Sequence, residues 1–444
     1  MKRIAITTLG CKVNQFESAA FASGFEAAGC TMVPFQAEAD VYVINTCTVT
    51  AKAGQQSRQL IRRVLHEHPG ARVIVTGCYA QMDPETVLNL AEHPVSIVGN
   101  GNKHLLVAAA LSEQPADLVM LMGKIREKKE ICDLPVKRFR GRTRAYLRIQ
   151  DGCDNFCSYC IVPYTRGRSR SVPLAGVLQQ TALFIEQGYQ ELVITGINVG
   201  KYGLDLAEGQ TIYSLLARLC RDFPGLRLRL SSIEPAEVND ALLDLMTSHS
   251  NFMPHLHIPL QSGDDAVLGR MNRRYTRAEF GAVIQRVRQT LPTAAIGCDV
   301  LGGFPGETEA QAANTYDLLA GLPVSYLHVF PYSRRPGTLA ASFSQHLPGP
   351  VKEARVQRLR VLDTEKRQAM YRDNIGLIHR VLVERRQAKS GLLLGFSENY
   401  LPIQFTGGSG LIRRVVPVRL TAVEDGQPMG ILAEDLLEES RQNS

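Results

Sequence analysis

The 444-residue sequence lacks any apolar run that approaches the roughly 18 residues of a membrane-spanning helix. Its first residues, MKRIAITTLGCK, have a basic start but neither the apolar centre nor the small-residue cleavage site of a secretion signal. No internal repeat or low-complexity tract stands out. These absences argue against membrane-spanning, secreted and repeat proteins, and we expect a cytoplasmic protein with no membrane partner.

The composition excludes two further classes. With 45% hydrophobic and 21% charged residues, the chain is neither disordered nor fibrous. A net charge of +7 is small for this length and bears on solubility and polyanion attraction, but not on fold. In a reducing compartment, the 10 cysteines are expected to be metal ligands, catalytic groups or core residues rather than disulfide partners.

The first part of the chain alternates strand-like and helix-like segments. Short runs rich in Val, Ile and Thr lie at Ile4–Leu9, Val41–Ile44 and Val73–Thr76, and helical stretches follow at Phe16–Ala28 and Gln55–His66. Such alternation is typical of βαβ units with a parallel sheet. We therefore predict a parallel-sheet α/β domain at the N-terminus.

From Arg144 onward the same strand-then-helix pattern recurs. It predicts strands at Ala145–Gln150, Glu191–Thr195, Arg227–Leu230, His255–Pro259, Ala294–Leu301 and Tyr326–Phe330. Six βα units indicate a partial or open (βα)6 barrel, although periodicity alone does not separate such a barrel from an open sheet.

The last part of the chain has a different pattern of predicted helices and strands. After a long polar helix predicted at 351–374, short strand-like runs and Gly-rich turns indicate a small all-β barrel. The predicted fold class is thus α/β with four segments: an α/β domain at 1–124, a charged, basic linker at 125–143, a (βα)6 barrel at 144–371 and a β-barrel at 372–444.

Three cysteines within eight residues give the strongest chemical signal. Cys153, Cys157 and Cys160 form a C-x3-C-x2-C run directly after the first predicted barrel strand, and we call them the barrel trio. Three thiolates can hold three corners of a cubane iron-sulfur cluster, which leaves one iron open to a small chelating molecule. The alternatives are a zinc site or inert core cysteines. Zinc sites usually add a second CxxC or a histidine pair, and no second CxxC exists here.

Three more cysteines each follow a predicted strand of the N-terminal domain. Cys11, Cys47 and Cys78 are spaced as successive βα units, so their side chains could converge at one sheet edge. We call them the sheet trio. Helix N-termini beside them would favour thiolates and an anionic cluster, whereas the alternative is three buried apolar cysteines. The remaining cysteines, namely Cys30, Cys132, Cys220 and Cys298, are interpreted as structural.

At this point the sequence resembles a known family. The C-x3-C-x2-C run resembles that of radical S-adenosylmethionine (SAM) enzymes, and its combination with the sheet-trio motifs resembles the methylthiotransferases. The similarity covers nearly the whole chain, and the C-terminal piece resembles a TRAM domain, a small β-barrel associated with RNA binding. The motifs that carry the resemblance are TLGCKVNQ at 8–15, NTCTVT at 45–50, GCYAQ at 77–81, the barrel trio, and SENYL at 397–401. Those at 10–14 and 397–401 look most like the branch that acts on N6-threonylcarbamoyladenosine at position 37 of tRNA, next to the anticodon.

The resemblance implies two [4Fe-4S] clusters and SAM as cofactors. The barrel trio would bind the cluster whose open iron chelates SAM and cleaves it to a 5′-deoxyadenosyl radical, which abstracts hydrogen from adenine C2. The sheet trio would bind an auxiliary cluster that presents a methylated sulfide to the activated carbon. The protein would supply positioning and exclusion of water.

Further residues at strand ends are candidates for binding SAM. The glycines of the 302–306 loop would let backbone approach an adenosyl group, Glu234 suits a ribose hydroxyl, and Tyr159 would lie near the adenine. The alternatives are an ordinary turn for the glycines and a packing role for the tyrosine. The candidate cofactor-binding residues are Tyr159, Asn198, Glu234, Gln261, Gly302, Gly303 and Gly306.

Basic segments recur along the chain and suggest a polyanionic partner. They lie at 137–148, at 270–277, in the 351–372 helix and in the C-terminal module. Any single charged run is most often a solvated surface, but recurrence across domains favours RNA. The expected partners are tRNA and a low-potential electron donor such as flavodoxin or ferredoxin, and the expected oligomeric state is a monomer.

Other functions remain open at this stage. The same chemistry could act on isopentenyl-modified adenosine in tRNA or on an aspartate of a ribosomal protein. A different class of function is a non-catalytic iron-sulfur protein that binds RNA. The open iron argues against that class, because a purely structural cluster would gain from a fourth cysteine.

Overall fold

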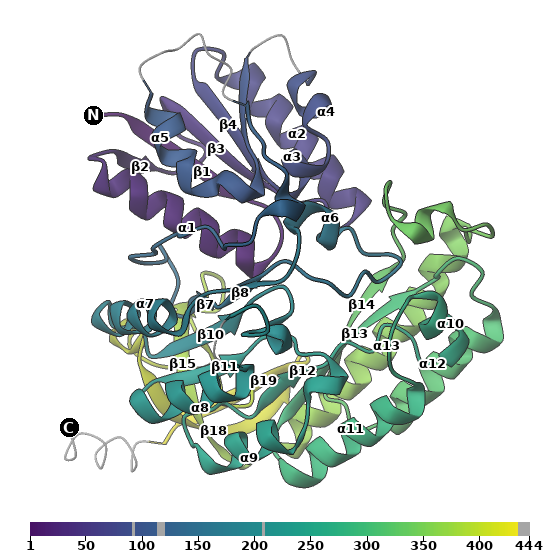
Figure 1. Ribbon diagram of the computed structural model, residues 1–444. Helices are drawn as coiled ribbons and strands as arrows, with labels where there is room; N and C mark the ends of the chain where they lie inside the picture. The colour runs from purple at the N-terminus through teal and green to yellow at the C-terminus, as the bar shows by residue number, and fades with distance from the viewer. Residues whose placement is uncertain (91–93, 113–119, 207–208, 434–444) are drawn as a thin grey trace.

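The computed structural model describes residues 1–90, 94–112, 120–206 and 209–433. An N-terminal parallel sheet with its helices sits above a larger half-barrel, and a small closed barrel packs beside that half-barrel (Figure 1). The fold class predicted from the sequence is confirmed: the first two parts are α/β, and the third is a small all-β barrel.

The N-terminal sheet is six-stranded, parallel throughout, and ordered β2-β1-β3-β4-β5-β6. Its strands are β1 (Arg3–Thr8), β2 (Thr31–Val33), β3 (Val41–Thr46), β4 (Arg72–Gly77), β5 (Val95–Val98) and β6 (Met120–Leu121). Its helices are α1 (Lys12–Ala27), α2 (Ala51–Glu67), α3 (Cys78–Met82), α4 (Pro84–Leu88) and α5 (Leu106–Leu111). Every residue of β3 is buried because helices cover both faces of the sheet, which explains its continuous apolar run.

The barrel consists of two three-stranded parallel sheets joined edge to edge. One has the order β11-β10-β7 and the other β12-β13-β14, and isolated bridges such as Ser232 to His257 connect β11 with the second sheet. The strands are β7 (Ala145–Arg148), β10 (Glu191–Thr195), β11 (Arg227–Leu230), β12 (His255–His257), β13 (Ala295–Gly302) and β14 (Tyr326–Pro331). β7 and β14 are not paired with each other, so the predicted partial (βα)6 barrel is confirmed.

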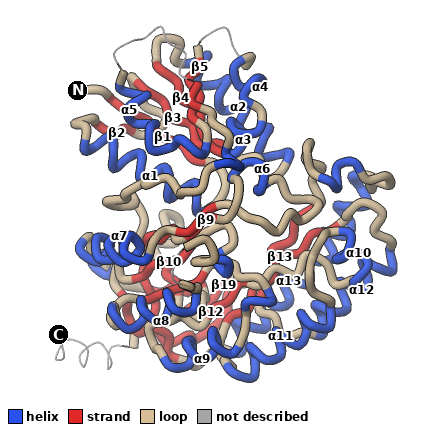
Figure 2. The backbone as a smooth tube through the Cα atoms, in the orientation of Figure 1, coloured by secondary structure: helices blue, strands red, loops and turns tan. Residues whose placement is uncertain are grey.

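Helices cover the outer face of the barrel (Figure 2). They are α7 (Leu174–Glu186), α8 (Ile212–Asp222), α9 (Asp240–Ser248), α10 (Asp265–Arg270), α11 (Arg277–Thr290), α12 (Glu309–Gly321) and α13 (Gly349–Asp373). The short helix α6 (Val162–Arg166) lies instead beside α3 of the sheet domain. Side-chain caps begin several of them, as at Thr276, which exchanges hydrogen bonds with Glu279 at the start of α11. A short antiparallel pair, β8 (Gln150–Asp151) with β9 (Arg170–Ser171), lies beside β7. The 3₁₀ turns are η1 (Asn100–Leu105), η2 (Ile125–Glu127), η3 (Val199–Lys201), η4 (Pro235–Glu237), η5 (Leu339–Ser342) and η6 (Ser409–Leu411).

The C-terminal module is a closed barrel with the strand order β15-β16-β17-β19-β18. Its strands are β15 (Ile378–Arg386), β16 (Leu393–Phe396), β17 (Pro402–Phe405), β18 (Val415–Glu424) and β19 (Gln427–Leu432). The short strand-like runs predicted from the sequence correspond to β15, β16, β17 and β18. The strand β19 was not predicted, because its sequence QPMGIL contains Pro and Gly. Residues 434–444 of the predicted 372–444 module lie outside the described residues.

The connector at 125–143, which the sequence analysis described as a charged, basic linker, is packed against both neighbouring domains. Ile125, Leu134, Val136 and Phe139 are buried, and the last three belong to the main hydrophobic core shared by the N-terminal domain and the barrel. The Tyr189 hydroxyl accepts a hydrogen bond from the Phe139 backbone N–H at 2.8 Å. Because these apolar residues are buried against both domains, the connector is packed between them, and we call residues 125–143 the strap.

Candidate active site

The sheet trio lies at the carboxyl ends of three adjacent parallel strands. β1, β3 and β4 are neighbours in register, with Thr8 opposite Asn45 and Thr46 opposite Gly77. The cysteines come within three residues of these strand ends, so the topology brings them to one edge. A Cβ atom on Gly10, which has a φ of +94°, would lie 2.7 Å from Cys47 Sγ. A glycine is therefore required here for the loop carrying Cys11 to approach Cys47.

The thiols of the sheet trio influence one another. Burial, followed by the proximity of Cys78, raises the pKa of Cys47 to about 11. Burial likewise raises the pKa of Cys11, and the Arg166 guanidinium opposes that effect. Cys47 and Cys78 are buried, whereas Cys11 is exposed. The raised pKa values of Cys11 and Cys47 favour their neutral thiols until a cation binds, and this donor set suits a metal cluster that binds thiolates.

Asparagines line the surroundings of the sheet trio. The amide of Asn14 donates to the carbonyls of Leu9 and Thr46 at 2.7 and 3.0 Å, which ties two of the cysteine loops together. Asn100 Nδ2 lies 3.9 Å from Cys78 Sγ, and its buried Oδ1 atom lacks a partner in the described structure. An unpartnered buried oxygen is costly, so it is a mark of a site that receives a ligand.

The barrel trio lies in the loop between β8 and α6, at the mouth of the barrel. The backbone N–H of Cys160 donates to the Cys157 carbonyl at 2.9 Å, and that of Cys153 donates to the Gly167 carbonyl at 3.1 Å. A Cβ atom on Gly152 would lie 1.9 Å from the Arg168 carbonyl oxygen, so only glycine fits this turn. These contacts curl the loop and bring its thiols together.

The segment after α10 anchors this loop from the other side. Ser158 N–H donates to the Met271 carbonyl at 3.0 Å, and the Asn272 amide donates to the carbonyls of Asn155 and Phe156. Phe156 adopts a φ of +46°, which is uncommon for a residue with a side chain. The loop is thus held in one shape by tertiary contacts.

The thiols of the barrel trio also fit a bound cluster. Burial, followed by Cys157, raises the pKa of Cys160 to about 12. Across residues 1–90, 94–112, 120–206 and 209–433, His257, Asp299 and His328 are the only three metal-ligating side chains whose ligand atoms all lie within 4.8 Å. Neither trio is found as such a group among the described residues, so neither is arranged as a site for a single ion such as zinc. A cubane separates its thiolate ligands more widely, so both trios fit a cubane better than zinc.

Asn198 and Glu234 lie beside the barrel trio, as the sequence predicted for residues that contact SAM. Asn198 Nδ2 is 4.0 Å from Cys153 Sγ, and its buried Oδ1 has no partner within the described part of the chain. Glu234 and Cys157 line one small pocket of about 100 Å³. Both side chains thus lie beside cysteines of the barrel trio, and their contact with SAM stays a prediction.

Arg273 is a site residue that sequence reasoning assigned to RNA. Its side chain is 5% exposed, pairs with Glu234, and places Nη1 at 3.5 Å from Cys157 Sγ. Burial and this pairing leave it unable to track phosphates at the surface. The motif RMNRRYTR does not show which of its arginines lies at the cysteine site, because the turn after α10 decides which arginine faces inward.

The glycine-rich loop after β13 is crowded by protein. A Cβ atom on Gly303 would lie 2.4 Å from the Lys352 side chain, and one on Gly306 would lie 2.7 Å from Arg270 Nη1. A Cβ atom on Gly302 would lie 3.0 Å from Val356 Cγ2. These glycines have packing reasons for lacking side chains, and their contact with SAM stays a prediction.

Tyr159 and Gln261, two further residues predicted to contact SAM, lie near the barrel mouth and contact other protein groups there. Tyr159 packs against an apolar cluster that includes Phe304 of the glycine-rich loop, and burial raises its pKa well above the ordinary value. Gln261 has a φ of +67°, and its backbone pairs with Val300 in β13. Their roles at SAM also stay predictions.

The loops that carry the two trios belong to domains that contact each other. Arg335, from the loop after β14, donates to the Thr48 hydroxyl beside Cys47 at 2.5 Å. The hydroxyl of Ser333 accepts a hydrogen bond from the Ala51 backbone at 2.8 Å. Figure 1 shows α3 of the sheet domain next to α6, which directly follows the barrel trio. The carboxyl edge of the sheet therefore covers the barrel mouth.

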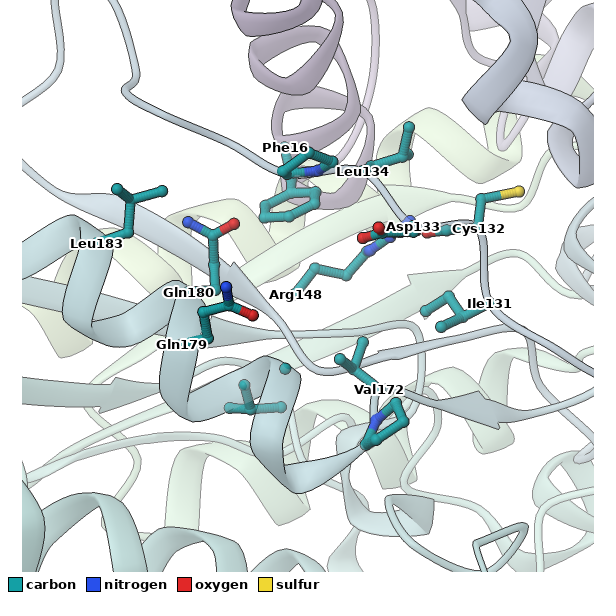
Figure 3. A pocket seen from close by; sticks show the side chains of 14 residues that line it. Phe16, Ile131, Cys132, Asp133, Leu134, Arg148, Val172, Gln179, Gln180 and Leu183 are labelled. Carbon is teal, nitrogen blue, oxygen red and sulfur yellow. Dashed lines mark hydrogen bonds between the residues drawn. The ribbon is translucent and has the colours of Figure 1, made fainter.

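Part of the predicted RNA-binding surface is internal. Arg148, in the basic segment at 137–148, is buried, stacks on the Phe16 ring at 4.9 Å and donates to the Cys132 carbonyl. Figure 3 shows Phe16 and Arg148 side by side in a pocket of about 370 Å³ between the connector and α7. Arg144 pairs with Glu384 at 2.8 Å. These two arginines join domains, which reduces the surface available to a polyanion.

Comparison with known proteins agrees with this architecture. Residues 3–99 match a family described as Uncharacterized protein family UPF0004, and residues 147–319 match the Radical SAM superfamily. Among solved structures, the radical SAM methyltransferase TsrM from Kitasatospora setae, with cobalamin and a [4Fe-4S] cluster bound, is similar with a TM-score of 0.56. The match has 15% identity and covers 77% of each chain, so it concerns the fold alone. Fold and site together define a radical SAM protein with an added sheet domain.

Curated relatives extend the match over the whole chain. Threonylcarbamoyladenosine tRNA methylthiotransferase MtaB of Aquifex aeolicus is 38% identical, with coverage of 91% of this chain and 97% of the relative. The protein of the same name from Bacillus subtilis is 35% identical over 100% of both chains. A tRNA-2-methylthio-N(6)-dimethylallyladenosine synthase of Cereibacter sphaeroides is 32% identical, covering 95% and 96%. The chain belongs to the methylthiotransferase family of radical SAM enzymes.

Proposed function

We propose that this enzyme converts N6-threonylcarbamoyladenosine in tRNA to its 2-methylthio derivative. The observation that carries the proposal is the presence of two thiol trios in adjoining domains, where α3, which begins at Cys78, contacts α6, which follows Cys160. The chain also aligns end to end with a relative of that name. The second candidate substrate is dimethylallyladenosine in tRNA, which the name of the Cereibacter sphaeroides relative supports. The higher identities to threonylcarbamoyladenosine enzymes favour the first.

We assign a cluster to each trio. Cys153, Cys157 and Cys160 would hold the [4Fe-4S] cluster that binds SAM, and the sheet trio would hold the auxiliary cluster. When bound, these groups supply a carbon-centred radical and a transferable methylthio group. The unpartnered oxygens of Asn100 and Asn198 support this assignment, because each lies beside a thiol of one trio.

The chain's own residues orient the substrate and exclude water. Glu234, held by Arg273, is placed to accept a hydrogen bond from a ribose hydroxyl of SAM. The sheet edge over the barrel mouth limits access of water to a reactive radical, which protects it from quenching. The exposed arginines of the C-terminal barrel are assigned to tRNA phosphates. Further proposals are a flavodoxin- or ferredoxin-like reductant, a monomeric state and a cytoplasmic location.

We further propose the domain limits 1–124, 125–143, 144–371 and 372–444, with the 125–143 strap packed between the first two domains. The closed strand order of the last segment supports its treatment as a unit. The hydrophobic core of that segment, which includes Val381, Ile403 and Phe405, is separate from the main core. An RNA-binding role for it rests on its resemblance to a TRAM domain.

Nucleoside analysis tests the function directly. Mass spectrometry of tRNA from cells without the gene should lack the 2-methylthio derivative of threonylcarbamoyladenosine and retain that of isopentenyladenosine. The intact gene should restore the first nucleoside, whereas Cys157→Ala and Cys11→Ala should not. Loss of the isopentenyl derivative instead would assign the second substrate.

Iron content tests the two-cluster assignment. The anaerobically reconstituted enzyme should hold about eight irons, and Cys153→Ala and Cys11→Ala should each lose about half. Cys30→Ala is the matched control, because this cysteine lies away from both trios and is partly buried in the sheet domain. A wild-type content near four would remove the auxiliary site.

A further inference from the structure

A chain of polar side chains lines the inner face of the barrel. His257 on β12, Asp299 on β13 and His328 on β14 lie on neighbouring strands. Asp299 Oδ1 is 2.9 Å from His257 Nε2 and 3.6 Å from His328 Nδ1. Along β13, Cys298 and Val300 point the other way and are buried in the core. The group is therefore on the lumen side, and we call its three residues the lumen group.

Hydrogen bonds beneath the lumen group fix its orientation. The Tyr326 hydroxyl lies 2.8 Å from His255 Nε2 and 3.3 Å from His257 Nδ1. If His255 donates to Tyr326, the hydroxyl donates to His257 Nδ1, and His257 Nε2–H then donates to Asp299. This assignment of tautomers satisfies each pair once. Burial alone would raise the pKa of Asp299, but hydrogen bonds from the two histidines hold that pKa below its usual value.

The outer end of the lumen group is open to a ligand. The His257 side chain is 7% exposed, whereas those of Asp299 and His328 are 25% and 49% exposed. Asp299 Oδ2 and His328 Nε2 have no hydrogen-bond partner among the residues that the structure describes. Phe330, two residues further along the same face of β14, is an exposed aromatic ring on which a base can stack.

Lys12 brings an uncommitted positive charge to the same place. It is the first residue of α1, which packs against the barrel edge strand β7. Its side chain is exposed, and neither a hydrogen bond nor an ion pair joins it to another group in the described ranges. Its ammonium lies within electrostatic range of Asp299, Tyr400 and Arg144.

The other cations near Lys12 are already paired. Arg144 donates to Glu384 at 2.8 Å, and Arg229 donates to Glu191 at 2.8 Å and to the Glu398 carbonyl at 2.9 Å. Tyr400 and His328 line a pocket of about 80 Å³ that reaches this region. The open side of the barrel thus offers one free ammonium, one free imidazole nitrogen and one free carboxylate oxygen.

We propose that Lys12 and His328 bind the carboxylate of the threonyl group of the substrate nucleoside, and that Asp299 accepts a hydrogen bond from the threonyl hydroxyl. This inference rests on the proposed function. A threonylcarbamoyl group carries one carboxylate and one hydroxyl, which complement these three side chains. An isopentenyl group carries neither and would leave them unpaired, and sites built for hydrogen bonding reject such analogues strongly. The lumen group and Lys12 are therefore the specificity determinant of the enzyme.

Binding to short RNA tests this assignment. The cluster-loaded, full-length enzyme is titrated with anticodon stem-loop RNA that carries threonylcarbamoyladenosine, unmodified adenosine or isopentenyladenosine. The wild type should bind the first most tightly. Lys12→Met should lose about 10- to 100-fold in affinity for the first RNA only, as expected for a lost charge-assisted hydrogen bond, and Lys12→Arg should regain part of it.

Two further variants keep the test decisive. His328→Gln removes the second contact at a position remote from the cysteines, and it should weaken binding of the same RNA alone. Lys52→Met, an exposed lysine at the start of α2, is the matched control and should bind all three RNAs as the wild type does. Iron content and the visible absorption of Lys12→Met should match the wild type, since Lys12 is next to Cys11 but is not a ligand.

The outcomes separate the inference from the proposed function. If the wild type converts threonylcarbamoyladenosine but Lys12→Met and His328→Gln bind it equally well, the inference alone is wrong. If the wild type shows no preference for the threonylcarbamoyl RNA, both are wrong. A stoichiometric non-iron metal that disappears in His328→Gln would also overturn the inference, because it would make the lumen group a cation site.

Discussion

Arg166 and Glu17 form an ion pair that joins the barrel to the sheet domain, with 3.1 Å between Nη1 and Oε1 and both side chains 1% exposed. Lys103 pairs with the same carboxylate, and Asp151 accepts from the same guanidinium at 2.8 Å. Arg166 interacts electrostatically with Cys11 and Cys78, and the carbonyl of the next residue, Gly167, accepts a hydrogen bond from the Cys153 backbone N–H. The network therefore joins the sheet domain to the segment that supports the barrel trio.

Loss of the Arg166 charge should destabilise the enzyme strongly. Arg166→Met leaves Glu17 and Asp151 buried without their main counter-ion, and breaking a buried pair in this way costs about 3–5 kcal/mol. Urea denaturation measures the effect. Arg138→Met, which removes an exposed partner of Glu26, is the matched control and should cost less than about 1 kcal/mol. Equal losses in both variants would contradict a special role for the buried network.

Arg273 should affect SAM rather than RNA. Arg273→Met frees Glu234 from its partner and removes a cation from Cys157, so the affinity for SAM should fall by about 10- to 100-fold. Equilibrium dialysis on cluster-loaded protein measures it. Arg277→Met changes an arginine of the same basic segment that does not line the pocket of Glu234 and Cys157, and it should leave SAM binding unaltered. Weaker tRNA binding with unchanged SAM affinity would return Arg273 to the RNA-binding surface.

Glu191 should make the barrel sensitive to acid. Its buried carboxylate contacts Arg229 at 2.8 Å and Arg227 at 3.1 Å. Burial raises its pKa, but these arginines outweigh that effect and lower it. A lowered pKa in the folded state adds stability above the unfolded value of about 4.3, and this stability is lost as the pH falls through the folded pKa.

Comparison with Glu191→Gln measures this contribution. The free energy of unfolding of the wild type should exceed that of the variant above about pH 5, and the difference should shrink as the pH falls below about 4. Glu186→Gln is the control, because Glu186 is an exposed residue at the end of α7. A difference that stays constant with pH would exclude Glu191 as the source.

The C-terminal barrel should contribute phosphate contacts. Arg385 on β15 and Arg414 before β18 are exposed, and the two segments are adjacent because the Val383 backbone donates to the Arg414 carbonyl at 3.0 Å. Arg385→Gln with Arg414→Gln should weaken tRNA binding and reduce the slope of log affinity against log salt by about 1.5 to 2. Arg218→Gln, which changes a paired arginine of α8 outside the predicted basic segments, is the control. An unchanged slope would remove these arginines from the interface.

The sequence predicted the fold wherever one period dominated. The buried runs of β1, β3 and β4 and the six barrel strands were found because apolar residues there are contiguous or alternate. The packing of the connector was not predicted, because the burial of Leu134, Val136 and Phe139 depends on contacts with both neighbouring domains. The strand β19 was missed because Pro428 and Gly430 lower its strand propensity, and only closure of the barrel makes it a strand.

The cysteine sites could be predicted from the sequence, because the spacing of thiols after a strand depends only on local geometry. Two groups of three cysteines, their strand-end positions and the family they indicate all followed from the order of residues. The direction in which charged side chains point was decided by tertiary structure. Arg148 and Arg273 face inward, and Lys12 lies within electrostatic range of Asp299, because burial and pairing depend on neighbours that are distant in sequence.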